Sequence, residues 1–514
     1  MPHNSIMIKM RINKIFISRA YSTRINLNRD VVIVSAVRTP MGSFLGSLSS
    51  IPAPKLGAIA IQAAVERARV TKEQVDEVYM GSALQAGIKH APARQATLFA
   101  GLPTSTICTT INKACASGMK CVMLAAQSLL CGHQDIILAG GMESMSNVPY
   151  YLKRGTTPYG GVTLHDGIMF DGLMDAFNKG FHMGNCAENI AKKLGITRQE
   201  QDEFAINSYK RSASAWRNKV FKDEVVPVNV PTKHGMPDLI VNEDEEYKHV
   251  IFDKLSKLKP VFQKDNGTVT AGNASTINDG AAALILTTAE VAEKLNLKPL
   301  ARIVDFHDAA TDPIDFPIAP TLASSKLLEK TGVKKDDVAL WEINEAFSAV
   351  AVANQKQLDL DPAKFNVHGG AVSLGHPVGM SGARIIVHLV HALKQGEKGV
   401  ASVCNAGGGA SSILIEKLRH PISPSPSLPR LQLFTKNPCP LCDVLKDELE
   451  AQFHGCYVLE QVDISKPGNE GLFELYRYQI PVLFFEGHYL CKHRLDIELL
   501  KKRFHDFKQL QLNS

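Results

Sequence analysis

Residues 113–141 read KACASGMKCVMLAAQSLLCGHQDIILAGG, and residues 377–409 read PVGMSGARIIVHLVHALKQGEKGVASVCNAGGG. Each stretch passes from Ser-Gly into an apolar helical pattern, and then through a glycine into an aliphatic strand. A shift of 264 positions aligns the first stretch with the second, laying Ser117 and Gly118 onto Ser381 and Gly382. The two halves are therefore predicted to be diverged copies of one α/β unit, packed face to face.

This arrangement brings two cysteines and a histidine into one predicted cleft. TICTTIN at 106–112 reads as a strand and a helix pattern follows it, so Cys115 is expected at a helix N-terminus. The helix dipole and free N–H groups there favour the thiolate, and a neighbouring imidazole can take the proton. Cys404 ends a strand in the second copy, and His376 stands in a Gly-His-Pro sequence. Three other cysteines read as small buried residues: Cys108, Cys121 and Cys131.

Seven motifs stand in a fixed order along residues 30–418: INKACASGMK, GGMESMS, HMGNCAENIA, VTAGNASTINDGAAA, WEINEAF, GGAVSLGHPVGMSGAR and CNAGGGAS. With these motifs the chain resembles the thiolases, and most of all their mitochondrial acetoacetyl-CoA type. The resemblance implies a five-layered αβαβα fold. It places the N-terminal domain at 30–298, with a loop domain inserted at about 149–268, and the C-terminal domain at 299–418.

The resemblance also implies an acyltransferase that condenses two acetyl-CoA molecules to acetoacetyl-CoA and CoA, or cleaves acetoacetyl-CoA in reverse. In that family Cys115 matches the cysteine that becomes acetylated, and His376 matches the group that activates it. Cys404 matches the acid/base for the α-proton, and Asn344 matches the residue that holds a water beside the thioester oxygen. A second oxyanion site uses the N–H groups of Cys115 and Ala406. Alanine replaces the usual glycine there, and this matters only if the position needs a positive φ.

Between Pro149 and Thr268 the repeat lapses, and Thr197-x-x-Glu200 predicts a capping box before a long helix. The stretch 246–259, EYKHVIFDKLSKLK, is basic, which suits either the phosphates of CoA or a solvated face. By resemblance, this segment and its surroundings bind substrate and CoA through Tyr209, His249, Val250, Ile251, Lys254, Ser275, His182, Met183, Phe316 and Ala406.

Mitochondrial acetoacetyl-CoA thiolases resemble this chain in a further respect, a monovalent-cation site. The matching residues suggest that potassium binds at Tyr209, Ala271, Gly272, Ala274 and Val372, mostly through carbonyl oxygens. No organic cofactor is implied, since CoA thioesters are substrates. The DFPIAP string around Phe316 resembles the version that also accepts 2-methylacetoacetyl-CoA.

Residues 1–29 carry six lysines and arginines and no acidic residue, with apolar residues between the charges. This composition predicts a mitochondrial transit peptide, with a disordered basic tail as the alternative. The six charges equal the whole formal net charge of +6, so the mature chain is nearly neutral and nucleic-acid binding is not expected. No apolar run reaches the ~18 residues of a membrane span, and a soluble matrix protein is expected.

A different pattern follows Leu418. RHPISPSPSLPR at 419–430 reads as a Pro/Ser linker. Residues 431–510 alternate strands and helices around Cys439-Pro-Leu-Cys442 and resemble a glutaredoxin-like domain of the thioredoxin fold. A redox pair is favoured over zinc, because the other two cysteines of this part lack paired spacing, and an inert domain stays open. Ile480-Pro-Val matches the cis-proline of that fold.

Three alternatives to an acetyl-CoA acetyltransferase stay open. The chain could be a 3-ketoacyl-CoA thiolase for longer chains, a thiol–disulfide oxidoreductase on an inert thiolase scaffold, or a non-catalytic CoA-binding module. The acetyl-CoA acetyltransferase hypothesis predicts acetyl-CoA, acetoacetyl-CoA and CoA as partners and a homotetramer. Two neighbouring reading frames joined in error would also give such a sequence.

Overall fold

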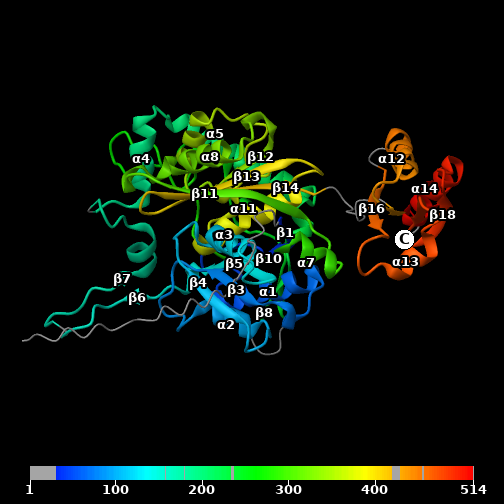
Figure 1. Ribbon diagram of the computed structural model, residues 1–514. Helices are drawn as coiled ribbons and strands as arrows, with labels where there is room; N and C mark the ends of the chain where they lie inside the picture. The colour runs from blue at the N-terminus through cyan, green and yellow to red at the C-terminus, as the bar shows by residue number, and fades with distance from the viewer. Residues whose placement is uncertain are drawn as a thin grey trace, which may run out of the picture. The chain divides into compact units, whose positions relative to one another are not determined.

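The computed structural model (Figure 1) describes residues 30–156, 158–178, 180–232, 237–418, 429–453 and 456–512. The predicted transit peptide at 1–29 and most of the predicted linker, 419–428, lie outside the described residues. The chain divides after Leu418 into two compact units, and each is described by itself.

The first half of the larger unit contributes five neighbouring strands. Their order in the sheet is β4-β3-β5-β10-β1, and the short strand β2 (Gly42–Ser43) pairs with β10. The bounds are β1 (Val31–Arg38), β3 (Glu77–Gly81), β4 (Ile107–Ile111), β5 (Ile136–Ser144) and β10 (Asn278–Thr288). β3 runs parallel to β5, whereas β10 is antiparallel to both β5 and β1. Three of these strands, β1, β5 and β10, are buried along their whole length, as befits strands covered on both faces.

The second half repeats this pattern. Its strands follow the order β12-β13-β14-β11, with bounds β11 (Ala301–Ala310), β12 (Val338–Ile343), β13 (Lys398–Asn405) and β14 (Gly409–Lys417). β12 and β13 are parallel, and β14 is antiparallel to β13 and to β11, so the ladder matches β3-β5-β10-β1 strand by strand. β1 pairs with β11 and joins the two halves.

Helices fill three layers around these strands. The central layer is α3 (Ser117–Leu130) and α11 (Val378–Ala392), which pack on each other and on the inner strands of both halves (Figure 1). The outer helices are α1 (Ala53–Ala68) and α2 (Pro92–Phe99) on the first half, and α8 (Ala319–Thr331) and α9 (Ser348–Gln357) on the second. Burial of each large aliphatic side chain in these layers stabilises the fold by roughly 1.5–3 kcal/mol. The predicted αβαβα architecture is confirmed.

The two central helices meet at the glycines that the repeat aligned. A Cβ at Gly118 would lie 2.9 Å from Ala383 Cβ, and a Cβ at Gly382 would lie 2.7 Å from the backbone nitrogen of Met119. The shift of 264 turns one contact into the other, so the crossing has approximate two-fold symmetry. Glycine is required at both positions because the backbones approach too closely for any side chain.

The segment between β5 and β10 forms the insertion that was expected from the lapse in the repeat. It contains α4 (Met183–Lys193), α5 (Arg198–Arg217) and α6 (Phe252–Leu255), together with β6 (Tyr150–Tyr151), β7 (His165–Asp166), β8 (Val228–Val230) and β9 (Leu239–Val241). The predicted capping box is present: the Thr197 hydroxyl accepts from the Glu200 N–H, and the Glu200 carboxylate accepts from the Thr197 N–H. Short helical turns complete it: η2 (Met145–Asn147), η3 (Ile168–Leu173), η4 (Val220–Asp223) and η5 (Glu246–Lys248).

Five further short elements lie outside the insertion: η1 (Lys72–Gln74), α7 (Ala289–Lys294), η6 (Pro313–Ile318), η7 (Lys335–Asp337) and α10 (Ala371–Leu374). None of the helices in the described part of the chain has both the length and the apolar character needed to cross a bilayer.

The smaller unit is a four-stranded sheet in the order β16-β15-β17-β18, flanked by three helices. Its elements are β15 (Arg430–Thr435), α12 (Pro440–Phe453), β16 (Val458–Asp463), α13 (Glu470–Tyr476), β17 (Val482–Phe485), β18 (His488–Lys492) and α14 (Ile497–Leu512). β15 is parallel to β16 and antiparallel to β17, which is the thioredoxin arrangement predicted from the sequence. The Ile480–Pro481 bond is cis, as the motif predicts.

Candidate functional site

A cavity of about 120 Å³, here the reactive cavity, lies in the larger unit. Eight of the predicted site residues line it: Cys115, His182, Met183, Ala274, Ser275, Phe316, His376 and Ala406. The wall is otherwise mostly apolar, with Met145, Gly172, Leu173, Phe262, Thr276, Ile277, Ala346, Phe347 and Val378. The sequence did not single out these nine residues, because apolar side chains carry no chemical signal of their own.

Cys115 sits on a sharp turn between β4 and α3. Ala114 has φ +44°, a left-handed conformation that side chains rarely adopt. The Ser117 hydroxyl accepts from the Lys113 N–H at 2.8 Å, and the Ser117 N–H donates to the Ala114 carbonyl at 3.0 Å. The helix itself begins at Ser117, two residues after the cysteine. This closed turn aims Cys115 into the cavity.

The expectation that the helix start favours the Cys115 thiolate is wrong, because burial outweighs it. Burial raises the pKa of Cys115 to about 12, and the Glu143 carboxylate adds to the rise. Hydrogen bonds from the backbone N–H groups of Cys115 and Ala406 oppose it without cancelling it. Cys115 therefore rests as a thiol and needs a base when it reacts. Both N–H groups nevertheless converge on its sulfur.

His376 has the properties of that base. Burial, with a smaller effect from the charge on Arg384, lowers the pKa of His376 to about 4, so the ring is neutral near pH 7. His376 Nδ1 lies 2.6 Å from Ser381 Oγ, and the Ser381 hydroxyl donates to the Pro377 carbonyl at 2.9 Å. Because the hydroxyl has one proton, its lone pair accepts from Nδ1–H, and this assignment leaves Nε2 with a free lone pair.

Cys404 lies near the end of β13 and is fully buried. Burial and the neighbouring Cys115 both raise the pKa of the Cys404 thiol. Ala406, two residues further on, lines the cavity and does not have a positive φ. Alanine therefore supplies the same N–H donor as glycine would, without strain.

Asn344 follows β12, and its N–H donates to the Ser402 carbonyl on β13 at 3.0 Å. It is 1% exposed, and neither the oxygen nor the nitrogen of its side-chain amide has a hydrogen-bond partner. A buried amide without partners costs roughly 1–3 kcal/mol per group, so such a group is expected to hold a water or a ligand atom.

A second, more open pocket of about 300 Å³, here the outer pocket, adjoins the reactive cavity, because Thr276 lines both. Seven predicted residues line it: Tyr209, His249, Val250, Ile251, Lys254, Ala271 and Gly272. Lys254 is the only basic residue besides His249 that the pocket wall contains, whereas Lys248 pairs with Glu243 at 2.9 Å. The structure thus brings the predicted CoA residues together around two adjoining pockets.

The predicted potassium residues fall into three places. Tyr209, Ala271 and Gly272 line the outer pocket, Ala274 lines the reactive cavity, and Val372 is fully buried against Tyr209. Burial, together with the charges on Glu246 and Glu345, raises the pKa of Tyr209 to about 12, so its phenol is neutral. Neutral oxygens from backbone carbonyls and a phenol form a donor set that fits a weakly held monovalent cation.

Two positioning groups were missed at the sequence level. Ser381 holds the His376 ring, and the His376 N–H donates to the Asn278 side chain at 2.8 Å. Ser381 was used only to align the two copies of the repeat, and Asn278 was given no role within the motif VTAGNASTINDGAAA. The bond to Asn278 spans 98 residues and leaves no local pattern from which it could be inferred, whereas Ser381 is only five residues from His376.

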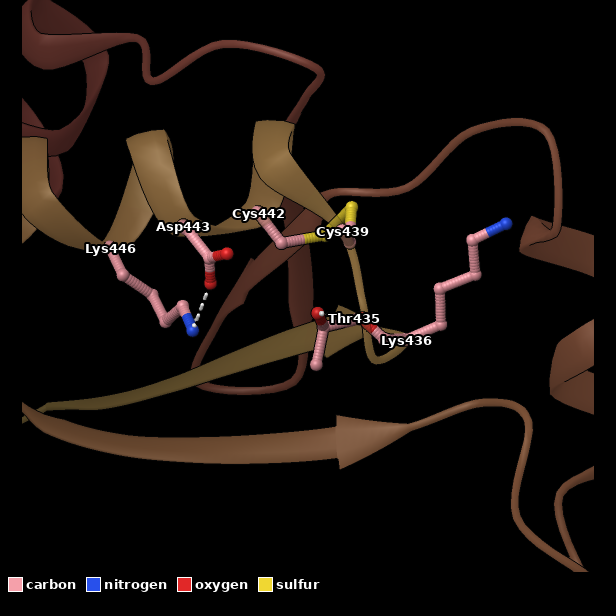
Figure 2. Close-up of a disulfide and its surroundings, with 6 residues drawn as sticks. All are labelled: Thr435, Lys436, Cys439, Cys442, Asp443 and Lys446. Carbon is pink, nitrogen blue, oxygen red and sulfur yellow. Dashed lines mark hydrogen bonds and ion pairs between the residues drawn. A yellow bond between two sulfur atoms is a disulfide. The ribbon is translucent and has the colours of Figure 1, made fainter.

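In the smaller unit a disulfide joins Cys439 and Cys442 where β15 passes into α12 (Figure 2). Cys442 is fully buried, and the Cys439 carbonyl accepts the first helical bonds, from the N–H groups of Cys442 and Asp443. Phe434 and Tyr476 pack around the pair with Ile464. Asp443 forms an ion pair with Lys446 at 2.7 Å on the same helix (Figure 2).

Family models match three parts of the chain. The "Thiolase, N-terminal domain" model covers residues 31–290, and the "Thiolase, C-terminal domain" model covers residues 297–417. The "Glutaredoxin-like domain (DUF836)" model covers residues 430–505.

Curated relatives and solved structures agree with these matches. The mitochondrial acetyl-CoA acetyltransferases of Rattus norvegicus and Homo sapiens are each 65% identical to this chain, over 78% of it and 94% of each relative. The Acat5 thiolase from Ascaris suum, solved in complex with coenzyme A, is 48% identical with a TM-score of 0.73, covering 76% of this chain and 100% of that one. The Bacillus anthracis acetyl-CoA acetyltransferase is 40% identical with the same TM-score, covering 76% and 99%.

Proposed function

The chain belongs to the thiolase family, and on that premise we propose that it is an acetyl-CoA C-acetyltransferase that works through an acetylated Cys115. One observation supports this most directly. Two backbone N–H groups, of Cys115 and Ala406, contact the sulfur of Cys115, and the neutral His376 lines the same small cavity. That combination supplies a nucleophile, a base and an oxyanion site in one place.

In the first half-reaction, His376 Nε2 takes the proton from Cys115, and the thiolate attacks the carbonyl carbon of acetyl-CoA. The developing oxyanion accepts hydrogen bonds from the N–H groups of Cys115 and Ala406. When the C–S bond to CoA breaks, the proton on His376 passes to the departing CoA thiolate. The products are free CoA and acetyl-Cys115.

In the second half-reaction, His376 Nε2 takes the proton from Cys404, and the resulting thiolate removes a proton from the methyl carbon of a second acetyl-CoA. The raised pKa of Cys404 means that little thiolate exists beforehand, but it also makes that thiolate a strong base. Negative charge develops on the thioester oxygen, where the now protonated Nε2 of His376 and a water held by Asn344 donate hydrogen bonds. The carbanion then attacks the carbonyl carbon of acetyl-Cys115, and the C–S bond to Cys115 breaks. The Cys115 thiolate takes the proton from His376 Nε2 as acetoacetyl-CoA leaves.

The dimensions of the reactive cavity favour a short acyl chain. Its volume is about 120 Å³, and three phenylalanines line it, Phe262, Phe316 and Phe347. Acetoacetyl-CoA fits such a space better than a long 3-ketoacyl chain, and a 2-methyl group adds only one carbon. The decisive experiment is a thiolysis assay with acetoacetyl-CoA, 2-methylacetoacetyl-CoA and a long-chain 3-ketoacyl-CoA. Faster cleavage of the long-chain substrate would replace this proposal with the longer-chain thiolase.

CoA is proposed to enter through the outer pocket and reach the reactive cavity past Thr276. Lys254 and His249 stand on the pocket wall within a basic segment, and they suit the phosphates of CoA. Ser275 lines the inner side of the same passage, close to the reacting thioester.

Potassium is proposed to bind near the outer pocket through Tyr209 and the carbonyls of the 271–274 turn and of Val372. The bound cation would supply a fixed charge that orders segments touching CoA. We expect potassium to lower the apparent KM for acetoacetyl-CoA more than sodium at equal ionic strength, because only a cation of the right size orders the turn. Steady-state kinetics in the two salts measure this, and identical KM values would contradict an occupied site.

A homotetramer in the mitochondrial matrix is proposed for the mature protein. The basic, acid-free segment 1–29 and the mitochondrial relatives support the compartment. Two surfaces support the assembly. Strand β4 lies at the end of the sheet, and its outer edge pairs with no strand among the described residues. The segment of β6 and β7 exposes Tyr150, Leu152, Val162 and Leu164. Light scattering of the purified enzyme measures the subunit number.

A second activity is proposed for the smaller unit, thiol–disulfide exchange through Cys439 and Cys442. The disulfide between them supports it, because both thiols lie within bonding reach at the start of a helix. Reduction by a dithiol would give two thiols and an oxidised dithiol. Titration of the thiols in a series of redox buffers, with Cys439→Ser as the control, measures a potential, and a pair that never reoxidises would remove this proposal.

A further inference from the structure

Asn278 begins β10 and is completely buried, and its side-chain amide makes four hydrogen bonds. Oδ1 accepts from the His376 N–H and from the Thr276 hydroxyl, each at 2.8 Å. Nδ2 donates to the Gly42 carbonyl and to Glu246 Oε1, each at 3.0 Å. An amide has two donors and two accepting lone pairs, so every site is used.

The partners fix which way the amide points. A backbone N–H can only donate and a backbone carbonyl can only accept, so Oδ1 must face His376 and Nδ2 must face Gly42. Gly375, just before the histidine, has φ +110°, and a Cβ there would lie 2.6 Å from the amide carbon of Asn278. The backbone that carries His376 therefore rests directly on the face of this amide.

The four partners lie in different parts of the site. His376 is the proposed base, Thr276 stands where the reactive cavity meets the outer pocket, and Glu246 is on the wall of the outer pocket. Glu246 is only partly buried, and it belongs to η5 of the inserted segment, whereas His376 belongs to the second half of the repeat. One amide thus connects the proposed base to the wall against which CoA is proposed to lie.

We infer that Asn278 is a positioning residue that holds the backbone of His376 and couples it to Glu246 on the wall of the outer pocket. The ring of His376 is already held by Ser381, so the amide fixes the other end of the residue. A displacement of Glu246 moves Nδ2 of Asn278. Because the amide is rigid, Oδ1 moves with it and shifts the backbone of His376. The inference rests on the proposed thiolase reaction and adds a link between the CoA pocket and its base.

The test uses a substrate that does not reach the outer pocket. S-acetyl-N-acetylcysteamine carries the acetyl thioester and only the end of the CoA arm, so it can acetylate Cys115 without touching Glu246. Glu246→Ala removes the bond to Asn278 and should slow this acetylation about tenfold, because a base displaced by a fraction of an ångström loses rate steeply. Glu246→Gln keeps an oxygen that accepts from Nδ2 and should restore most of the loss.

Acetylation is measured by intact-protein mass spectrometry at short times, with acetyl-CoA run in parallel. If Glu246 acts only as a CoA contact, Glu246→Ala slows the reaction with acetyl-CoA and leaves the short thioester unaffected, which would overturn the inference. Equal loss in the Ala and Gln variants would also overturn it.

A direct variant has a matched control. Asn278→Asp keeps the acceptor for His376 but sets a carboxylate against Glu246, and it should lower acetylation of Cys115 by both thioesters. Asn354 in α9 is equally buried and also makes four bonds, to Thr321 N, Thr321 Oγ1, Pro317 O and Val350 O, but it does not contact His376. Asn354→Asp should lower stability without slowing acetylation per folded molecule.

Failure of this inference is distinct from failure of the proposed function. If the wild-type protein does not form acetyl-Cys115 from acetyl-CoA, the proposed function itself is wrong. If the wild type is acetylated and Glu246→Ala reacts with the short thioester at the same rate, only the coupling through Asn278 is wrong. Should Asn278→Asp fail to fold, the two Glu246 variants still decide the matter, because they alter a side chain that is open to the pocket.

Discussion

Cys115 and Cys404 are neighbouring thiols with different surroundings. Cys115 lines the reactive cavity and receives two backbone hydrogen bonds, whereas Cys404 is fully buried next to Cys115. A nucleophile must meet a carbonyl carbon, so exposure to the cavity and oxyanion donors suit Cys115. A strong base for a weakly acidic C–H needs a high pKa, which burial gives to Cys404.

These roles predict opposite behaviour for two variants. Cys115→Ser should abolish condensation and thiolysis and leave no covalent acetyl group. Cys404→Ala should still trap acetyl from acetyl-CoA, since acylation needs no carbanion, while condensation falls by at least about a thousandfold. Mass spectrometry after peptide digestion locates the adduct. An acetyl group on Cys404 of the wild type, or none on Cys115, would reverse the assignment.

The neutral His376 predicts a pH dependence of stability. Its pKa is about 4 when folded and about 6.5 when unfolded, so between these values only the unfolded chain takes up the proton. The contribution of His376 to the free energy of unfolding therefore falls as the pH drops from 6.5 to 4, and it is constant above pH 6.5. Between pH 7 and pH 5 the wild type should lose about 2 kcal/mol more unfolding free energy than His376→Gln. Urea denaturation measures both.

The control for this experiment is His133→Gln, which alters an exposed histidine. Its loss of stability between pH 7 and pH 5 should equal that of the wild type. Equal pH dependence in the wild type and His376→Gln would show that the histidine is not held neutral by its surroundings.

Among the elements, α3 and α11 cross in close backbone contact at the two glycines that the repeat aligns. Gly118→Ala would place a methyl group 2.9 Å from Gly379 O and Ala383 N, which are backbone atoms that cannot turn aside. The helices must separate, and we expect a loss of about 1–3 kcal/mol in unfolding free energy. Because α3 carries the Cys115 turn, thiolysis should fall as well. Gln127→Ala on the exposed face of α3 is the control and should change neither quantity.

The elements show what the sequence could and could not predict. Both repeat helices, the capped helix α5 and the order of elements in the smaller unit follow from periodicity, capping residues and glycine positions, because these signals are local. The pairing of β1 with β11, and the position of Thr276 between two pockets, depend on residues far apart in the sequence. No sequence pattern predicts them. Burial also outweighed the helix-start effect on the Cys115 thiol, and burial at one atom cannot be inferred from a motif.

For the whole molecule, the division after Leu418 predicts independence of the two units. A protein ending at Leu418 should keep the kcat/KM of the full chain for thiolysis, within about twofold, because the proposed site lies wholly in the larger unit. Cys439→Ser in the full chain should be equally neutral. Loss of thiolysis in the shortened protein would show that the smaller unit takes part in the reaction.

The mass of the natural protein checks whether both units belong to one polypeptide. The full chain has a mass of 56.1 kDa. An antibody against the thiolase part should detect one band at that mass, less only the residues removed on import. A band smaller by the size of the last 96 residues would show that two reading frames had been joined in error.

The reciprocal glycine contact also bears on how such a chain arose. A polypeptide with one copy of the repeat would carry both the glycine and the backbone that packs against it on one helix. Two identical molecules could therefore form both contacts in a symmetric dimer. Duplication followed by fusion would turn that concentration-dependent association into an intramolecular one. Each half would then be free to specialise: here Cys115 lies in the first half, and His376 and Cys404 lie in the second. The symmetry of the repeat remains at Gly118 and Gly382, because a side chain at either glycine would clash with the helix of the other half.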